Sequence, residues 1–365
     1  MDIYEVDKVI KQIREQLDYQ VYLTPLNFKE ENDKFLACFQ SGEIYNPQYK
    51  YTSFSHSCDS NNLERIICYL RTDESSIGRI LLESADSLSK EIVMYQTIGS
   101  NADFTKSAIC VHGKPNINLL PDAIGELQNA FAIDSKGNEI SAAFLAEAIK
   151  RRLSIYGFSW NVELLDNMAS RVSVEPEKRS IYINKYKYFT PNDIKRLLVH
   201  EIDTHVLRSE NGHRVGLEVL SSGTAGSLIH EEGLALYNEW LNDVQDIVTM
   251  RLYAARFIAC CNIHLSFYDL FKMLISYDCP LEQAMYVVSR IKRGISDTSL
   301  PGGFIKDYVY YQGFHEIKEF IAHHPKAYED LYYGSISIKD IDILKNDIYD
   351  RRLGKAIILP IKTDM

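Results

Sequence analysis

The stretch "TPNDIKRLLVHEIDTHVLRSENG", residues 190–212, decides how this chain folds around its chemistry. Thr190 fits a helix N-cap, Pro191 the first helical position and Asp193 the acid of a capping box. Apolar residues follow at helical spacing, and Gly212 is the expected end. The pattern predicts a helix, with the polar residues within 200–205 in its interior turns.

This helix contains His200, Glu201 and His205, a His-Glu-x-x-x-His pattern. The common zinc-protease signature has histidines four apart, on one helix face, with a catalytic glutamate beside the first. Histidines five apart are offset by about 140° on a regular helix and would point away from each other. A one-residue π-bulge, or unwinding after Asp203, would bring them together. Either distortion places Asp203 beside the insertion, where its charge could weaken catalysis.

A third candidate ligand lies in "HEEGLALYNEW", residues 230–240. Zinc peptidases complete their coordination with a carboxylate from a following helix and leave one position open for water. Glu231 and Glu232 are both candidates, but a helical wheel places Glu232 beside the buried face and Glu231 nearly opposite. Glu239 and Glu231 could then orient the side chains that bind the metal without binding it themselves. The apolar residues that define this face are Ile229, Leu236, Tyr237, Trp240 and Leu241.

Two imidazoles and one carboxylate would hold one Zn²⁺ per chain and lower the pKa of water to near 7. Glu201 is placed to take a proton from that water and to give it to the leaving amine. Hydrolysis of a peptide bond is the reaction that these groups suit.

The residues before this helix predict strands. "FSWNVEL", residues 158–164, alternates as a strand does, and "SRVSVEPEKRSIYINK", residues 170–185, predicts a β hairpin. Its edge strand could pair with an extended peptide. Residues 139–157 predict a helix closed by Gly157, and the chain beyond 224 is nearly all helical until a loop at 301–303.

The N-terminal part predicts paired helices within residues 62–97 and a short strand at "SAICVHG", residues 107–113. Turn signals between about 115 and 138 suggest a boundary. We therefore expect a helical and irregular region at 1–138 that covers the core, and a catalytic domain at 139–365, although one compact unit remains an alternative. The expected class is mainly helical α+β.

The pairing of "HEIDTHVL" (200–207) with "EEGLA" (231–235) resembles the metallopeptidase family named for its Gln-Glu-Gly-Leu-Ala motif, whose animal members include the microtubule-associated tyrosine carboxypeptidases. "LTPLN", "NPQYKY" and "RIKRGISDTSLPGGFIKDYVYYQG" agree with it, so the resemblance covers about residues 20–315.

The resemblance implies a zinc carboxypeptidase with a thermolysin-like (gluzincin) core. The implied ligands are His200, His205 and Glu232, and the implied acid/base is Glu201. This sequence departs from the family pattern at Glu231, where Gln often stands, and at Asp203, where a small Gly is expected.

A carboxypeptidase must bind a terminal carboxylate, and cationic side chains do this best. Arg293 and Lys306 are the candidates near the Gly-Gly loop, with Arg251 as a further one. The alternative is that Lys306 is solvated and Arg293 only neutralises a helix end. By resemblance Tyr310 is the tyrosine in register, which could stabilise an oxyanion or could be a buried structural residue.

The composition limits the partners. A formal net charge of −10 argues against nucleic-acid binding. It also disfavours an acidic, tubulin-like tail as substrate, because like charges repel at long range. Apolar runs are too short to span a membrane, and seven cysteines without a CxxC pair favour the reduced cytoplasm.

The preferred function is removal of one C-terminal residue, by resemblance Tyr or another aromatic, from a peptide or protein. The alternatives are an endopeptidase or aminopeptidase on the same zinc core, and a catalytically weak, metal-stabilised regulatory or interaction protein.

Overall fold

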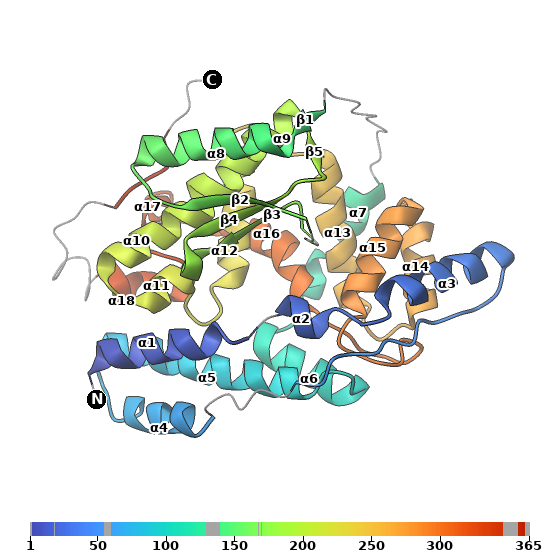
Figure 1. Cartoon of the computed structure of the whole chain (residues 1–365), viewed down its shortest axis with the longest axis horizontal. Coiled ribbons are helices and arrows are strands. Elements are labelled where there is room, and N and C mark those ends of the chain that lie inside the picture. The colour runs from blue at the N-terminus through green and yellow to red at the C-terminus, as the bar shows by residue number, and fades with distance from the viewer. Residues whose placement is uncertain are drawn as a thin grey trace.

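The part of the chain that the structure describes is mainly helical with two small β-sheets, an α+β arrangement (Figure 1). The computed structural model describes residues 2–17, 19–54, 60–128, 139–166, 168, 170–345 and 357–361. Within these ranges, no helix has the length and apolar character needed to cross a membrane.

The N-terminal part consists of helices, and the paired helices expected within 62–97 are confirmed as α4 and α5. The strand expected at 107–113 is wrong, because these residues end helix α6. Phe104 and Ala108 lie four residues apart on its buried face, which the short apolar run alone did not reveal. The helices of this part are α1 (Ile3–Arg14), α2 (Tyr19–Leu23), α3 (Phe28–Ser41), α4 (Ser60–Leu70), α5 (Ser76–Gln96), α6 (Asn101–His112) and α7 (Leu120–Gln128).

Helix α8 (Ala142–Tyr156) ends at Gly157 as expected and lies across a three-stranded sheet (Figure 1). The sheet has the order β2–β4–β3, with β2 (Asn161–Leu165) parallel to β4 (Ser180–Asn184). The predicted hairpin is confirmed, because β3 (Val172–Glu175) pairs antiparallel with β4. β3 is therefore an edge strand. The second sheet pairs β1 (Ile140–Ser141) with β5 (Tyr188–Phe189).

The helix over 190–212 begins as predicted but ends later. Thr190 and Asp193 form the capping box at the start of α9 (Pro191–Leu197). A π-helical segment (Leu198–Val206) and α10 (Leu207–Val215) continue it without a break. Gly212 does not end the helix. A Cβ at this position would lie 2.2 Å from the carbonyl oxygen of Leu220, so glycine allows the helix to pack closely against the backbone of Leu220.

The remaining helices follow α10 in the sequence. α12 and α16 cross at two glycines: a Cβ on Gly233 would lie 2.3 Å from the backbone of Gly313. The buried face predicted for α12 is wrong at Trp240 and Leu241, which are 41% and 54% exposed near its end. The helices are α11 (Glu218–Ser222), α12 (Leu228–Leu241), α13 (Ile247–Cys261), α14 (Phe267–Ser276), α15 (Leu281–Ile291), α16 (Val309–His323), α17 (Ala327–Asp330) and α18 (Ile341–Leu344).

Three apolar cores lie within the described residues. One lies between α8, the sheet and the π-helical segment, and it includes the fully buried Ile202 and Val206. The largest contains residues from distant parts of the sequence, such as Val6 and Leu344. The smallest includes Tyr95 of α5 and Phe104 of α6. The predicted domain boundary at 138 falls within 129–138, outside the described residues, and it stays a prediction.

Candidate active site

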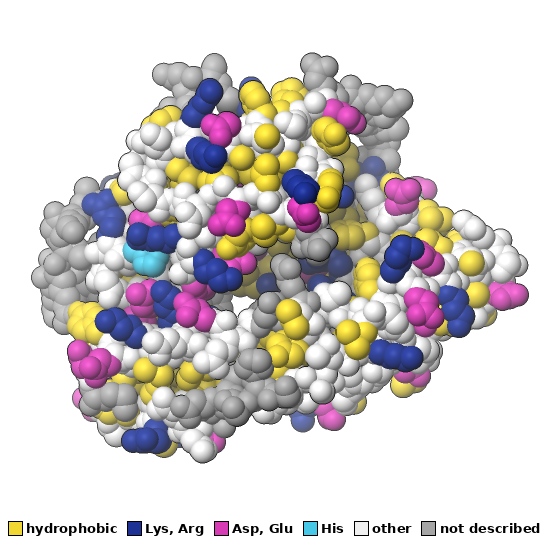
Figure 2. Space-filling view, viewed as in Figure 1, with side chains coloured by type: hydrophobic (Ala, Val, Ile, Leu, Met, Phe, Trp, Pro, Cys, Tyr) yellow, Lys and Arg dark blue, Asp and Glu magenta, His cyan; other side chains and the backbone are white. Residues whose placement is uncertain are grey.

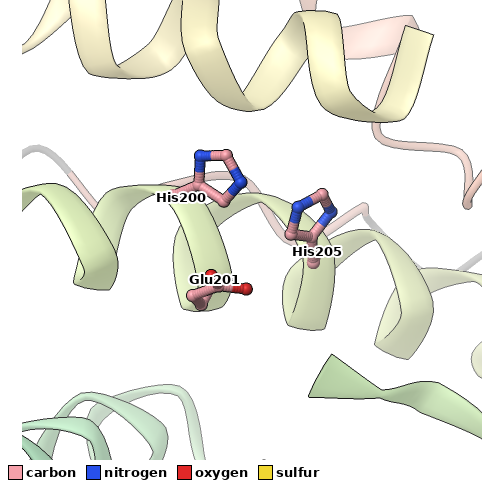
Figure 3. A group of neighbouring side chains, drawn as sticks. All are labelled: His200, Glu201 and His205. Atoms are coloured by element: carbon pink, nitrogen blue, oxygen red, sulfur yellow. The ribbon is translucent and has the colours of Figure 1, made fainter. Parts of the chain in front are cut away.

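The π-helical segment turns His200 and His205 to the same side of the helix (Figure 3). Of the two distortions considered, the extra residue is therefore accommodated by a π-helix. The imidazole centroids lie 4.9 Å apart. His200, Glu201 and His205 each offer a ligand atom within 4.8 Å of the others, which makes them a possible metal-binding group.

The two imidazoles share one carboxylate near their Nε2 atoms, and each has a separate carboxylate at its Nδ1 atom, which we call the rear carboxylate. Oε2 of Glu232 lies 3.7 Å from Nε2 of His200 and 3.8 Å from Nε2 of His205. Nδ1 of His200 lies 2.7 Å from Oε1 of Glu239, and Nδ1 of His205 lies 2.8 Å from Oε1 of Glu231. The structure thus brings together all five residues that the sequence placed at the metal and behind it.

Each rear carboxylate is neutralised by a buried arginine. Arg196 donates to Oε1 of Glu239 at 3.1 Å, and Glu239 has no exposed surface. Arg208, which is also fully buried, pairs with Glu231. The sequence prediction missed both arginines. Helical spacing could have found them, because Arg196 precedes His200 by four residues and Arg208 follows His205 by three.

The rest of Arg208 is tied to the loop after α17. Its guanidinium donates to the carbonyl oxygens of Leu331, Gly334 and Ile336. This loop is distant in sequence, so the anchoring of Glu231 depends on tertiary structure that no local motif encodes.

The carboxylates make the site attractive to positive charge. Burial opposes the charged imidazolium of His200, but the carboxylates of Glu232 and Glu239 outweigh it and raise the pKa of His200 to about 10. The pKa of His205 is raised as well, where burial is outweighed mainly by Glu231 and Glu232.

Asp203 faces α8 rather than the histidine pair. Its carboxylate accepts a hydrogen bond from the hydroxyl of Tyr156 at 2.8 Å and lies 3.1 Å from Nη2 of Arg152. The negative charge at the insertion is therefore paired with Arg152.

A cleft of about 970 Å³ opens over this group, and its wall includes Glu201 and Glu232. The edge strand β3 lines another part of the wall, and Arg14 and Glu91 reach it from the N-terminal helices. Figure 2 shows the molecule hollowed near the centre of one face, with Lys or Arg side chains inside the hollow.

Cations from the helical wall line the cleft. Arg256 of α13, Arg290 of α15 and Lys306 before α16 all reach it. Asp307 accepts from Arg290 at 2.5 and 2.9 Å and lies 3.7 Å from Nε of Arg256. Burial opposes the ionised carboxylate of Asp307, but Arg290 and Arg256 outweigh it and hold its pKa well below the usual range. Burial lowers the pKa of Lys306.

The sequence candidates for carboxylate binding differ in position. Lys306 lines the cleft, whereas Arg293 is not among the described side chains that do so. Arg293 donates to the carbonyl of Arg290 and lies over the ring of Phe304. Arg251 donates to the carbonyl of Leu127. Sequence reasoning missed Arg256, which lies in a helix without a local motif. It also missed Arg290, although this residue opens the stretch 290–313 that resembles the family.

Tyrosines complete the wall beside these cations. Tyr310 lines the cleft and stacks on Tyr253 with ring centroids 4.6 Å apart and planes 2° apart. The guanidinium of Arg256 lies over both rings and donates to the hydroxyl of Tyr286 at 2.9 Å. Burial, and then the charge of Glu232, raise the pKa of Tyr310 well above its ordinary value.

Comparison with known proteins identifies relatives of this chain. The model of the microtubule-associated tyrosine carboxypeptidase family matches residues 36–360, which contain both motifs. Microtubule-associated tyrosine carboxypeptidase 1 of Rattus norvegicus and that of Mus musculus are each 26% identical over 340 residues, which is 89% of this chain. The Homo sapiens protein is 25% identical over the same length. The chain spans 61–62% of the length of these curated relatives. By the family match, the chain belongs to the microtubule-associated tyrosine carboxypeptidase family.

Proposed function

We propose that this chain is a zinc-dependent carboxypeptidase with a thermolysin-like core, which removes one residue from the C-terminus of a peptide or protein. The observation that carries the proposal is the position of Oε2 of Glu232. This oxygen lies 3.7 Å from Nε2 of His200 and 3.8 Å from Nε2 of His205. All three side chains line an open cleft, together with Glu201.

These three residues fit a zinc ion as ligands. Separations of 3.7 and 3.8 Å are too long for hydrogen bonds. Ligand atoms of a tetrahedral zinc ion with bonds of ~2.0 Å lie about 3.3 Å apart. The three side chains would therefore need to approach one another only slightly to bind zinc. Carboxylates at both Nδ1 atoms leave the two Nε2 atoms for the metal, which is how histidine ligands are usually oriented.

Zinc, when bound, supplies Lewis-acid chemistry, because it lowers the pKa of water and polarises a carbonyl oxygen. Glu201 accepts the proton of the attacking water and then gives it to the leaving amine. Tyr310 donates a hydrogen bond to the oxyanion that develops on the scissile carbonyl. Its raised pKa keeps the phenol protonated for this role.

The cleft walls supply binding for the end of a peptide. The free edge of β3 pairs with an extended backbone. Lys306 and Arg290 bind the terminal carboxylate, and Arg293 supports them through its bond to the Arg290 carbonyl. Tyr286, which is 42% exposed, offers an aromatic ring to a terminal side chain, which favours Tyr or another aromatic there.

The substrate is a protein or peptide C-terminus in the cytoplasm. The names of the relatives associate those proteins with microtubules, so a tubulin-like tail is a candidate. The net charge of −10 disfavours an acidic tail at long range, and the cations of the cleft offset this only locally.

The test is mass spectrometry of a peptide pool incubated with the zinc-loaded protein, beside Glu201→Gln. Each peptide is supplied with a free and with an amidated C-terminus. We expect loss of single C-terminal residues, mostly aromatic, from the free acids only, and no cleavage by Glu201→Gln. Internal or N-terminal cuts would replace the exopeptidase by the endopeptidase or aminopeptidase alternative. Zinc binding without any cleavage would favour the metal-stabilised interaction protein.

A further inference from the structure

Asp203, which lies within the His-Glu-x-x-x-His segment, is held by two residues of α8. The side chain of Asp203 is 5% exposed and that of Arg152 is 8% exposed, with 3.1 Å between Oδ2 and Nη2. Tyr156 donates to the other oxygen at 2.8 Å. A buried carboxylate must be paired and hydrogen-bonded to be tolerated, and Asp203 is both.

Tyr156 also contacts the C-terminal end of the described chain. Its hydroxyl oxygen accepts a hydrogen bond from the backbone N–H of Ile361 at 3.0 Å. Asn211, on α10, binds the backbone of Ile358 twice, at 2.8 and 3.0 Å. The segment 357–361 is thereby fixed both to the residue that holds Asp203 and to the helix that continues the π-helical segment.

A π-helical turn needs such support. The extra residue breaks the regular spacing of backbone hydrogen bonds, so the segment keeps this form only where side chains hold it. On the opposite side, Thr204 donates to the carbonyl of Val199 at 2.9 Å, and Tyr332 donates to the carbonyl of Asp203 at 3.2 Å. On the α8 side, the only described polar contacts of the Asp203 carboxylate are those with Arg152 and Tyr156.

We propose that Asp203, Arg152 and Tyr156 form a clamp, anchored to the C-terminal segment through Ile361, that holds the π-helical segment in the form that keeps His205 beside His200. The three residues are positioning residues, because they act on the metal site through the backbone of the insertion. The inference rests on the proposed function, since it assumes that His200 and His205 bind zinc. Asp203 then supports the site instead of weakening it.

The experiment measures the zinc affinity of the full chain by competition with a chromophoric chelator, well below the unfolding temperature of each variant. Tyr156→Phe and Ile361→Pro each remove one part of the clamp. We expect both to weaken zinc binding by about tenfold or more, as the loss of groups that orient ligands does. Two control variants leave the clamp intact. Tyr49→Phe removes a buried hydroxyl that is bonded to Asn32 at 2.8 Å and is not part of the clamp. Ile361→Ala keeps the backbone N–H that binds Tyr156. Both controls should retain the wild-type affinity.

A double-variant comparison separates a clamp from general destabilisation. If the three residues act as one unit, adding Tyr156→Phe to Asp203→Asn causes little further loss of zinc affinity, whereas independent effects would multiply. Equal zinc affinity in Tyr156→Phe, Ile361→Pro and the controls would overturn the clamp while leaving the proposed function intact. A wild-type chain that binds no zinc would overturn both.

Discussion

Glu231 and His205 are joined by a contact of 2.8 Å between Oε1 and Nδ1, and the other oxygen of this carboxylate pairs with the fully buried Arg208. The pairing fixes the ring of His205 so that Nε2 faces Glu232 at 3.8 Å. The negative charge of Glu231 is therefore compensated by Arg208.

Replacing this carboxylate should weaken metal binding. We expect Glu231→Gln to lower zinc affinity about tenfold, because the amide no longer pairs with Arg208 and polarises the imidazole less. Glu239→Gln should act similarly through His200. Isothermal titration with zinc measures both. Glu147→Gln, which alters only an exposed pair with Lys150, is the control, and an unchanged affinity in the first two variants would contradict their assigned roles.

Removing zinc should lower the stability of the protein. A ligand that binds only the folded state at 100 times its Kd adds about 2.7 kcal/mol to the free energy of unfolding. We therefore expect a chelator to lower the Tm of the wild type and added zinc to restore it. Glu232→Gln should show a much smaller response to zinc, since one proposed ligand is weakened. A wild-type Tm that does not depend on zinc would count against a metal at this site.

The helix start, the histidine pair, the hairpin and the glutamates of α12 could be predicted from local patterns, because caps, period and motif spacing are encoded within a few residues. The sequence left the π-bulge and unwinding as alternatives, and the choice depends on contacts such as Tyr332 with the carbonyl of Asp203. Arg256 and Arg290 could not be assigned, since only packing of α13 against α15 brings them to one cleft. The strand at 107–113 failed because a short apolar run does not distinguish a strand from a buried helix.

Close packing of α12 on α16 predicts a strong response to one added methyl group. Gly233→Ala would place a Cβ 2.3 Å from the backbone of Gly313 and force the two helices apart. We expect a loss of about 1–3 kcal/mol in the free energy of unfolding. Gly125→Ala is the matched control, because no atom lies within 4 Å of its Cβ, and it should be neutral or slightly stabilising. Urea unfolding measures both, and equal effects would argue against the close crossing.

Asp7 should make the stability depend on pH. Burial raises the pKa of its carboxyl to about 6, although the backbone N–H groups of Glu218 and Val219 oppose the shift. A raised pKa means that the folded state binds the proton more tightly, so this contribution is complete below pH 4 and is lost as pH rises through 6. Between pH 5 and 8 the wild type should lose about 1 kcal/mol relative to Asp7→Asn. Urea unfolding at both pH values measures the difference, and parallel behaviour of the two proteins would contradict it.

Lys306 should separate recognition of the terminal carboxylate from the chemistry at Glu201. Lys306→Met removes a cation from the cleft wall, and a hydrogen bond to a charged group is worth about 1.5–3 kcal/mol. We therefore expect kcat/KM for free-acid peptides to fall roughly 10- to 100-fold. Cleavage of amidated peptides should stay as low as in the wild type, so the preference for acid over amide shrinks. Lys150→Met, at an exposed pair on α8, is the control. An undiminished preference in Lys306→Met would transfer the carboxylate-binding role to Arg290 or Arg256, which line the same cleft.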